Sequence, residues 1–485
     1  MGERRAKVLA PLALLAAQAT ASAFAVDLEH LLNQAIRARA APENIDQQVH
    51  LAETLAWSKR FDEAEALYRR VLQAAPQRRD ARLGLARVLL WSGRYRDARL
   101  EAEKVAAGDQ RDADALEVRA MAAYWSGDLR RALRELRQVL SLDPGRQTIR
   151  QAVSDIEQAS LPEYELAAAL TDDDQPYRLL QSRATVRAFS DPLTRWSAAI
   201  GTYRAAGRSS VREIPFGTIG ARVIWPEAAL TVTSAIGGIR YPDGMTRPTG
   251  MISASWRATP RSSVALRAER RELLSTATAL GSHPSSITYA VSWRRDPSDR
   301  SGWSAAAESA ALRYFDGNSG SSSYAWLLVP VHRDRWRLEV GASAALADTA
   351  AGRFQVESVS GTESEGAFRY SYRGLYSPYW TPRDLREARA IAVASAEFGR
   401  VRLSLHGEGG LGRDLGTAFQ PDAGLTRLPS TIEAFELRRH YHPYRTEAKA
   451  STRLPGNTRL DVAVGLKSTV FYRARTFDVT LVRHR

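Results

Sequence analysis

The chain has 485 residues, 44% of them hydrophobic and 8% aromatic, and it carries a formal net charge of +14. It contains no cysteine, which excludes a disulfide scaffold, a thiolate metal site and a thiol nucleophile. Beyond the N-terminus no apolar run reaches the roughly 20 residues of a membrane-spanning helix, and the aromatic content argues against a disordered chain. The positive charge permits an anionic partner but by itself is weak support for nucleic acid.

Residues 1–25 have the three parts of a secretory signal peptide. A basic start that includes Arg4 and Arg5 precedes a short apolar run at residues 8–17, and small residues at 21–25 offer cleavage sites. A buried first helix is the alternative interpretation. We expect export from the cytoplasm, and therefore no nucleic-acid partner.

A 34-residue period dominates the next segment. Trp57, Trp91 and Trp125 are spaced by 34 residues, and alanines keep the same period in two further registers. These alanines are Ala52, Ala86 and Ala120, and Ala64, Ala98 and Ala132. Small residues let paired helices approach closely, while Gly93 and Gly127 suit tight turns between the two helices of a unit. Prolines two periods apart, at positions 76 and 144, are expected to end second helices.

This spacing resembles the tetratricopeptide repeat, a helix-turn-helix unit of the same length. The resemblance implies an α-solenoid in which the units stack into one continuous core, because no single unit can bury its own apolar face. The parts expected are a leading helix at 27–39, repeats at 45–78, 79–112 and 113–146, and a closing helix at 147–159, within a domain at 26–159.

The three periodic tryptophans allow two interpretations. In the resembled family this position, just before the turn between helices, faces the concave groove. Trp57, Trp91 and Trp125 would then form a candidate groove for a partner or a sugar chain, because indole rings offer large flat faces with a polar edge. The alternative is that each ring packs between neighbouring repeats, since periodic aromatic residues usually mark a core.

From about residue 161 onward, apolar and polar residues alternate with the period of a β-strand. Residues 264–271, 335–343, 401–408 and 459–467 show this pattern clearly. Single strands carry charges of both signs, which suits the polar interior of a membrane barrel better than the solvated face of a two-sheet sandwich. At roughly 20 residues for each strand and its connection, the segment predicts about 16 strands. A soluble all-β domain is the alternative.

The expected fold is therefore an α + β multidomain chain, with an N-terminal α-solenoid followed by a transmembrane antiparallel β-barrel over residues 160–485. Aromatic residues near strand ends predict the interfacial girdles of such a barrel. They are Trp225, Trp256, Trp293, Tyr314, Trp336, Tyr379 and Trp380. Short periplasmic turns are expected at 333–334 and 455–457. Long external loops are expected at 275–285, 347–364 and 413–429.

Nine charged residues on the polar faces of these strands are the candidate lining of the barrel lumen. They are Arg267, Glu269, Arg271, Arg337, Glu339, Arg402, Arg459, Asp461 and Lys467. Such charges either set the selectivity of a conduit or pair across neighbouring strands and stiffen the wall.

The order of signal, solenoid and barrel resembles the outer-membrane subunits of exopolysaccharide secretion, of the cellulose-synthase and poly-N-acetylglucosamine export porin type. It is also similar to a smaller family of repeat-plus-barrel outer-membrane proteins. Besides the repeats, Tyr376, Ser377 and Pro378 followed by Trp380 resemble a short segment of the cellulose-type barrels.

This resemblance implies a Gram-negative outer-membrane porin that takes part in biofilm formation, with its N-terminal domain in the periplasm. The expected partners are outer-membrane lipid, a polysaccharide chain that passes through the barrel, and periplasmic or synthase-complex proteins that bind the repeats. The alternative is a structural or adhesive outer-membrane barrel that transports nothing and uses its solenoid for protein interaction.

Catalytic chemistry has little support in the sequence. His440 and His442 would face one side of a strand, but no carboxylate ligand is obvious nearby. Ser404 and His406 do not differ from ordinary polar residues of a lumen. Without a triad or metal signature we expect no enzymatic activity, no cofactor and no metal site.

Overall fold

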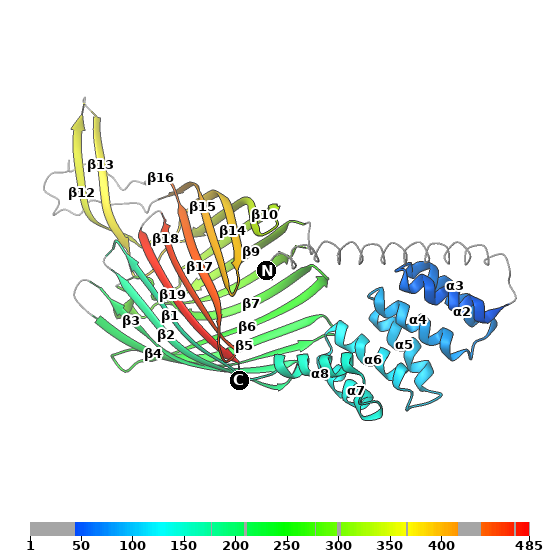
Figure 1. Ribbon diagram of the computed structural model, residues 1–485. Coiled ribbons are helices and arrows are strands. Elements are labelled where there is room, and N and C mark those ends of the chain that lie inside the picture. Colours follow the sequence, from blue (N-terminus) through cyan, green and yellow to red (C-terminus); the bar gives the residue numbers. More distant parts are fainter. Residues whose placement is uncertain are drawn as a thin grey trace, which may run out of the picture. The chain divides into compact units, whose positions relative to one another are not determined.

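The computed structural model divides into two compact units, Met1–Ala159 and Ser160–Arg485 (Figure 1). The residues it describes are 44–175, 177–207, 211–276, 278–297, 302–364, 367–415, 438–469 and 472–484, without the side chains of 355–375 and 438. The expected signal peptide at 1–25 and the leading helix at 27–39 lie outside the described residues.

The first unit is a row of antiparallel helix pairs. Its helices are α2 (Ile45–Trp57), α3 (Phe61–Ala74), α4 (Arg79–Trp91), α5 (Tyr95–Ala106), α6 (Ala113–Ser126), α7 (Leu129–Leu142) and α8 (Gln147–Ala159). The turns after α4 and α6 use Gly93 and Gly127 in the left-handed conformation, with φ of 83° and 86°. In the first pair the same position holds Lys59, also at positive φ.

Small residues hold the helix pairs together, as their period predicts. The six periodic alanines are fully buried. Gly84 of α4 lies against the buried ring of Tyr68 of α3, and a Cβ at position 84 would come within 2.3 Å of that ring. The close contact between these helices therefore requires glycine at this position.

The second unit is a closed antiparallel barrel of 16 strands, which confirms the predicted fold class. The first eight strands are β1 (Glu163–Asp173), β2 (Arg178–Asp191), β3 (Thr194–Ala206), β4 (Val211–Trp225), β5 (Leu230–Arg240), β6 (Thr246–Thr259), β7 (Ser262–Glu272) and β8 (Ser285–Arg295). The others are β9 (Ser304–Tyr314), β10 (Ser319–Arg333), β11 (Trp336–Thr349), β14 (Leu385–Phe398), β15 (Val401–Leu415), β17 (Tyr444–Leu454), β18 (Thr458–Ser468) and β19 (Arg473–His484). Because β1 pairs with both β2 and β19, the wall has no free edge there.

Three further elements lie in the connections. The short helix α9 (Ala279–Ser282) is part of the β7–β8 loop, and β16 (Arg438–Tyr441) pairs with the last residues of β15. Strands β12 (Phe354–Ser364) and β13 (Ala367–Tyr376) form a separate hairpin outside the main sheet (Figure 1).

Connections at the two ends of the barrel differ in length. Short turns such as 334–335 and 455–457 lie at the end where the chain enters β1, close to their expected positions. The long loops lie at the opposite end. The prediction of a loop at 347–364 is wrong in part, because β11 extends to Thr349 and residues 354–364 form β12. A hairpin satisfies its own backbone hydrogen bonds and needs no apolar face, so this polar strand was not recognised. Of the loop expected at 413–429, residues 413–415 belong to β15 and the rest lies outside the described residues.

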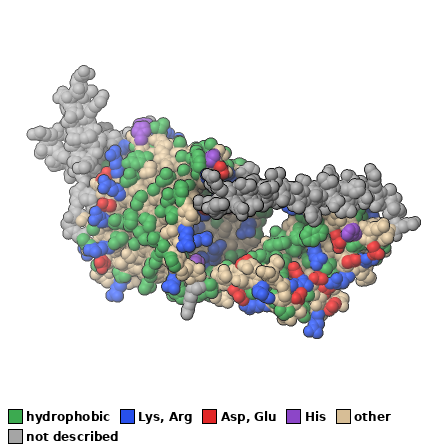
Figure 2. All heavy atoms as spheres, in the orientation of Figure 1, with side chains coloured by type: hydrophobic (Ala, Val, Ile, Leu, Met, Phe, Trp, Pro, Cys, Tyr) green, Lys and Arg blue, Asp and Glu red, His purple; other side chains and the backbone are tan. Residues whose placement is uncertain are grey.

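Large apolar side chains point outward from the barrel wall. Ile200 and Ile236 are 70% and 74% exposed, and Figure 2 shows hydrophobic side chains spread over the outer surface in view. Three tryptophans share the outer face at the short-turn end: Trp225, Trp256 and Trp293. Leu230 is paired with both of the first two, and Val264 is paired with both of the last two, so all lie on one face. An apolar surface edged by tryptophans is the girdle expected of a membrane barrel.

Three of the aromatic residues expected in the girdles lie elsewhere. Tyr314, Tyr379 and Trp380 line the interior at the long-loop end instead of the outer surface. Trp336, by contrast, is exposed at the short-turn end. Tyr314 faces inward because it lies on the same face of β9 as the inward Glu308. For Tyr379 and Trp380 the prediction failed because the inward fold of their segment depends on distant contacts.

Candidate functional site

The inner face of the barrel carries ion pairs that join neighbouring strands. On β1 and β2, Glu165 pairs with Arg183 at 2.7 Å and with Arg187 at 2.9 Å. On β14 and β15, Arg389 pairs with both Glu387 and Glu408. In the first group one carboxylate is shared by two arginines, and in the second one arginine is shared by two carboxylates. Much of the charge on the inner face is therefore neutralised locally.

The charged residues of β7 lie on this inner face. Arg267 forms ion pairs with Glu269 at 2.7 Å and with Glu308 of β9 at 2.9 Å. Glu269 and Arg271 line the cavity described below. Leu266, the residue that precedes Arg267 in the alternating pattern, is exposed on the opposite face.

The remaining candidates are distributed around the wall, each on the polar face of its strand. Arg459 lies 3.3 Å from Asp461 on β18, and the Nζ of Lys467 lies 5.1 Å from the ring centroid of Tyr472. Arg402 pairs with Glu397 near the short-turn end, where both are about two-thirds exposed. Register puts Arg337 and Glu339 on the face of β11 that carries Ser343, and neither forms an ion pair with a described residue.

Sequence reasoning missed several charged residues of the inner face. They are Glu165, Arg183, Arg187, Glu308, Glu387, Arg389 and Glu408. Their signal was present, since Arg183 and Arg187 follow the same two-residue alternation as the chosen candidates. Their partners could not be named, because an ion pair such as Arg267 with Glu308 joins residues 41 positions apart.

A cavity of about 920 Å³ occupies the interior towards the long-loop end. Its walls combine charged side chains with aromatic rings. The charged residues are Arg183, Arg187, Glu269, Arg270, Arg271, Glu272 and Asp348, and the aromatic residues are Tyr203, Phe216, Tyr314, Tyr379, Trp380 and Tyr472. Such a surface offers many hydrogen-bond donors and acceptors next to flat apolar faces, which suits a polar ligand with apolar faces.

The loop between β7 and β8 folds against the inner wall at the long-loop end. Leu274 and Leu280 of this loop are buried in an apolar cluster with Ile214 and Ile239 of β4 and β5. The hydroxyl of Tyr177 also donates a hydrogen bond to the carbonyl oxygen of Leu274 at 2.5 Å. This loop therefore narrows the mouth of the barrel.

A second inward segment, at residues 376–383, contacts the first. The hydroxyl of Thr276 donates to the carbonyl oxygen of Pro378 at 2.5 Å, which joins the two segments. The ring of Tyr379 stacks on Tyr314 of β9 at 4.3 Å between centroids, and its hydroxyl donates to Asp316 at 2.8 Å. The two segments together form an inward-folded mouth.

In the helical unit, the tryptophans are exposed and also contact neighbouring repeats. Trp57, Trp91 and Trp125 are 77%, 38% and 41% exposed. Ring centroids of Trp57 and Trp91 lie 5.7 Å apart, and those of Tyr95 and Trp125 lie 6.3 Å apart. The geometry thus combines features of both interpretations of these residues, and their role as a binding groove stays a prediction.

Ion pairs also connect successive repeats. Arg79 of α4 pairs with Asp112 at 2.6 Å, and Asp112 in turn caps α6 by accepting from the backbone N–H of Ala115 at 3.1 Å. The hydrogen bond from the Arg79 guanidinium holds the pKa of Asp112 below its ordinary value. This carboxylate therefore stabilises both the helix start and the contact between repeats.

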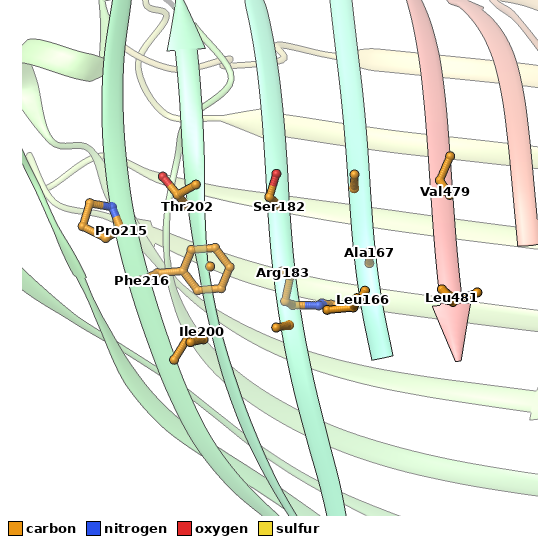
Figure 3. A pocket seen from close by; sticks show the side chains of 13 residues that line it. Leu166, Ala167, Ser182, Arg183, Ile200, Thr202, Pro215, Phe216, Val479 and Leu481 are labelled. Atoms are coloured by element: carbon orange, nitrogen blue, oxygen red, sulfur yellow. The ribbon is translucent and has the colours of Figure 1, made fainter. Parts of the chain in front are cut away.

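The outer wall has a shallow apolar hollow of about 850 Å³ over β1–β4 and β19 (Figure 3). Small residues such as Ala168, Ser182 and Ala184 form its floor between Leu166 and Ile200. A Cβ at Gly201 would lie 2.2 Å from the carbonyl oxygen of Ser182. The hollow follows from the small side chains of its floor and brings no group of reactive side chains together.

No described helix is long and apolar enough to cross a bilayer. Among the described residues, no group of three or more His, Cys, Asp or Glu side chains could hold a metal ion. His440 and His442 are both exposed.

Comparison with known proteins identifies the repeats. Residues 58–122 match the family model for the tetratricopeptide repeat. None of the curated proteins compared with the chain matches it.

Several solved structures are similar to parts of the chain. One described as a bacterial polysaccharide outer membrane secretin is 10% identical, with 67% of this chain and 99% of that chain covered and a TM-score of 0.49. MamA from Desulfovibrio magneticus is 22% identical, with 26% and 73% covered and a TM-score of 0.25. A tetratricopeptide repeat protein from Parabacteroides merdae is 15% identical, with 28% and 54% covered and a TM-score of 0.26.

Proposed function

We propose that the protein is an outer-membrane pore for exopolysaccharide export, and that its repeats recruit periplasmic or synthase-complex proteins. The observation that carries the proposal is the closed barrel, whose outer face is apolar and whose inner face is charged. In a closed sheet every strand has two neighbours, so backbone groups stay paired in lipid. A polar interior then provides a path for a hydrated solute.

The chemistry of the cavity favours a polysaccharide over a small ion as the solute. Locally paired charges such as Arg267 with Glu269 leave little net field to select an ion, but they supply donors and acceptors for hydroxyl groups. Aromatic rings such as Tyr203 and Tyr314 supply faces on which sugar rings stack. Many weak sites in a row let a polymer bind and still move on.

The orientation proposed for the barrel follows from its connections. In bacterial outer-membrane barrels the short turns are periplasmic and the long loops are external. The helical unit precedes β1, and β1 begins at the short-turn end. The repeats would therefore be in the periplasm, where their exposed tryptophans are available to partners.

Polymer transport is tested directly by electrical recording. The purified full chain is inserted into a planar bilayer, and its single-channel current is measured with and without added exopolysaccharide fragments. We expect an open-channel current that the fragments interrupt, and we expect Tyr203→Ala to shorten the interruptions. A current that all fragments leave unaltered contradicts the proposal.

The second candidate is a structural or adhesive barrel that transports nothing, and the inward-folded mouth favours it. A variant in which a short Gly-Ser linker replaces residues 275–282 separates the two. A transporter should gain conductance when this loop is removed. A barrel that stays electrically silent with and without the loop supports the structural role.

A further inference from the structure

A second hollow, of about 860 Å³, lies on the outer wall between β8 and β10. Two indole rings and three aliphatic side chains line it. The rings belong to Trp293 and Trp303, and the aliphatic residues are Leu327, Val329 and Val331. All five are more than a third exposed, so this apolar surface faces the surroundings of the barrel and not its interior.

A guanidinium group lies at the edge of this hollow. The Cζ of Arg295 is 4.3 Å from the ring centroid of Trp303. Register puts Arg295 and Leu327 on either side of Ala305, so all three share the outer face of the wall. The cation is therefore held against the apolar surface by a tryptophan ring.

Arg295 has no anionic partner among the described residues. None of the described carboxylates forms an ion pair with it, and its Nε is buried without an acceptor in the described part of the chain. Arg333, at the same hollow, donates one hydrogen bond to the carbonyl oxygen of Gly302 at 3.1 Å and adds a second positive charge.

The position of the hollow matches the headgroup region of a bilayer. Trp293 belongs to the tryptophan girdle at the short-turn end, and such girdles lie where the headgroups meet the acyl chains. Arg295 is at the end of β8, whereas Leu327 and Val329 continue along β10 away from the short turns. A cation at headgroup depth beside an apolar groove complements a phosphate that is attached to an acyl chain.

We propose that this hollow binds one glycerophospholipid of the leaflet at the short-turn end, with Arg295 and Arg333 at its phosphate and Leu327 and Val329 along an acyl chain. The inference rests on the membrane insertion included in the proposed function. It does not depend on polymer transport, because every residue of the site lies on the outer wall or at its rim.

The test is native mass spectrometry of the full chain in detergent micelles, titrated with dioleoyl phosphatidylglycerol. We expect one tight adduct, which Arg295→Gln weakens roughly ten-fold through loss of a charge-assisted contact. The matched control is Arg294→Gln, because Arg294 neighbours Arg295 on β8 but faces the lumen opposite Ser263. Equal weakening in both variants, or unchanged binding in Arg295→Gln, overturns the proposal.

Two further probes separate the phosphate from the acyl chain. Dioleoylglycerol has the acyl chains without the phosphate. It should therefore bind the wild type no more tightly than it binds the Arg295→Gln variant. Millimolar inorganic phosphate should not displace the lipid, and displacement would mean that the site binds a free anion only, which overturns the lipid assignment. Heat-modifiable mobility in gels verifies that each variant is folded. If Arg295→Gln does not fold, Trp303→Leu takes its place, and we expect it to weaken lipid binding as well.

Single-channel recording distinguishes this proposal from the proposed function. Arg295→Gln should leave the conductance at the wild-type level, since the residue is outside the lumen. If the wild type binds the lipid but passes no current, the transport proposal fails and the lipid site stands. If the wild type conducts but binds no lipid, the lipid site fails and the transport proposal stands.

Discussion

In the helical unit apolar side chains point to the interior, whereas in the barrel they point outward. Ala86 and Leu89 of α4 are fully buried, while Ile200 and Ile236 of the barrel are exposed on its outer face. The ion pairs differ in the same way, because Arg137 with Glu157 is exposed on the surface of the helical unit and Arg267 with Glu269 lines the lumen. The same residue classes therefore occupy opposite positions in the two units.

The difference teaches what each unit is built to contact. Burial of apolar surface stabilises a unit that is surrounded by water. An outward apolar face is stable only where lipid replaces water around the wall. The same kind of substitution at an exposed position should therefore affect the stability of the two units differently. Four experiments test or refine that contrast.

The largest effect is expected from a charge on the outer face. Ile236→Arg should lower the free energy of unfolding in lipid vesicles by about 2 to 4 kcal/mol, because the guanidinium would have to enter hydrocarbon. The control is Thr249→Arg on the lumen side, where we expect a loss below about 1 kcal/mol. Urea unfolding followed by gel mobility measures both, and equal losses would mean that the outer face does not contact lipid.

In the helical unit a single methyl group should be costly. Gly84→Ala should destabilise the unit by about 1 to 3 kcal/mol, because its Cβ would overlap the ring of Tyr68. Thermal unfolding of the helical circular dichroism signal in the full chain measures the loss. Gly108→Ala is the matched control, since its Cβ would meet no atom closer than 3.5 Å. Similar midpoints for the two variants would contradict the packing argument.

The Asp112 carboxylate makes the stability of the repeats depend on pH. Because its pKa is lowered in the folded state, it stabilises the unit above its unfolded pKa of about 3.9, and this contribution is lost as the pH falls through the folded value. Asparagine caps a helix about as well as aspartate does, so Asp112→Asn should act mainly on the ion pair. It removes one of the two charge-assisted hydrogen bonds from Arg79 and should cost about 1 to 2 kcal/mol at pH 7 and much less at pH 2. Thermal midpoints at the two pH values provide the measurement. A difference between variant and wild type that persists unchanged at pH 2 would exclude this carboxylate as its source, and Asp62→Asn, at an exposed acid, is the control.

The smallest effect is a gain. Lys59 has a φ of 60° where the other repeats have Gly93 and Gly127. Lys59→Gly should stabilise the helical unit by about 1 kcal/mol, because glycine adopts this conformation without the Cβ clash. Gly93→Lys should cost a similar amount. Two shifts of the thermal midpoint in the same direction would show that the turn conformation is not what limits stability.

Local periodicity made the architecture predictable. The 34-residue spacing of tryptophans and alanines indicates helix pairs, and the two-residue alternation indicates strands with one polar face. Both signals depend on regular spacing along the chain. For that reason the inward placement of Arg267 on β7 follows from its sequence alone, while its partner Glu308 does not.

Contacts between distant segments decided the rest. Tyr379 resembled a girdle residue in sequence, but it stacks on Tyr314 inside the mouth because residues 376–383 fold against the β7–β8 loop. The sequence does not single out Arg295, because its place beside Trp303 depends on the register of β8 with β9. The sequence by itself determined the elements, their order and their polar faces, since these follow from local spacing. Only the tertiary structure decided the closure of the wall, the ion-pair partners and the inward-folded mouth, because each requires segments that are far apart in the chain to meet.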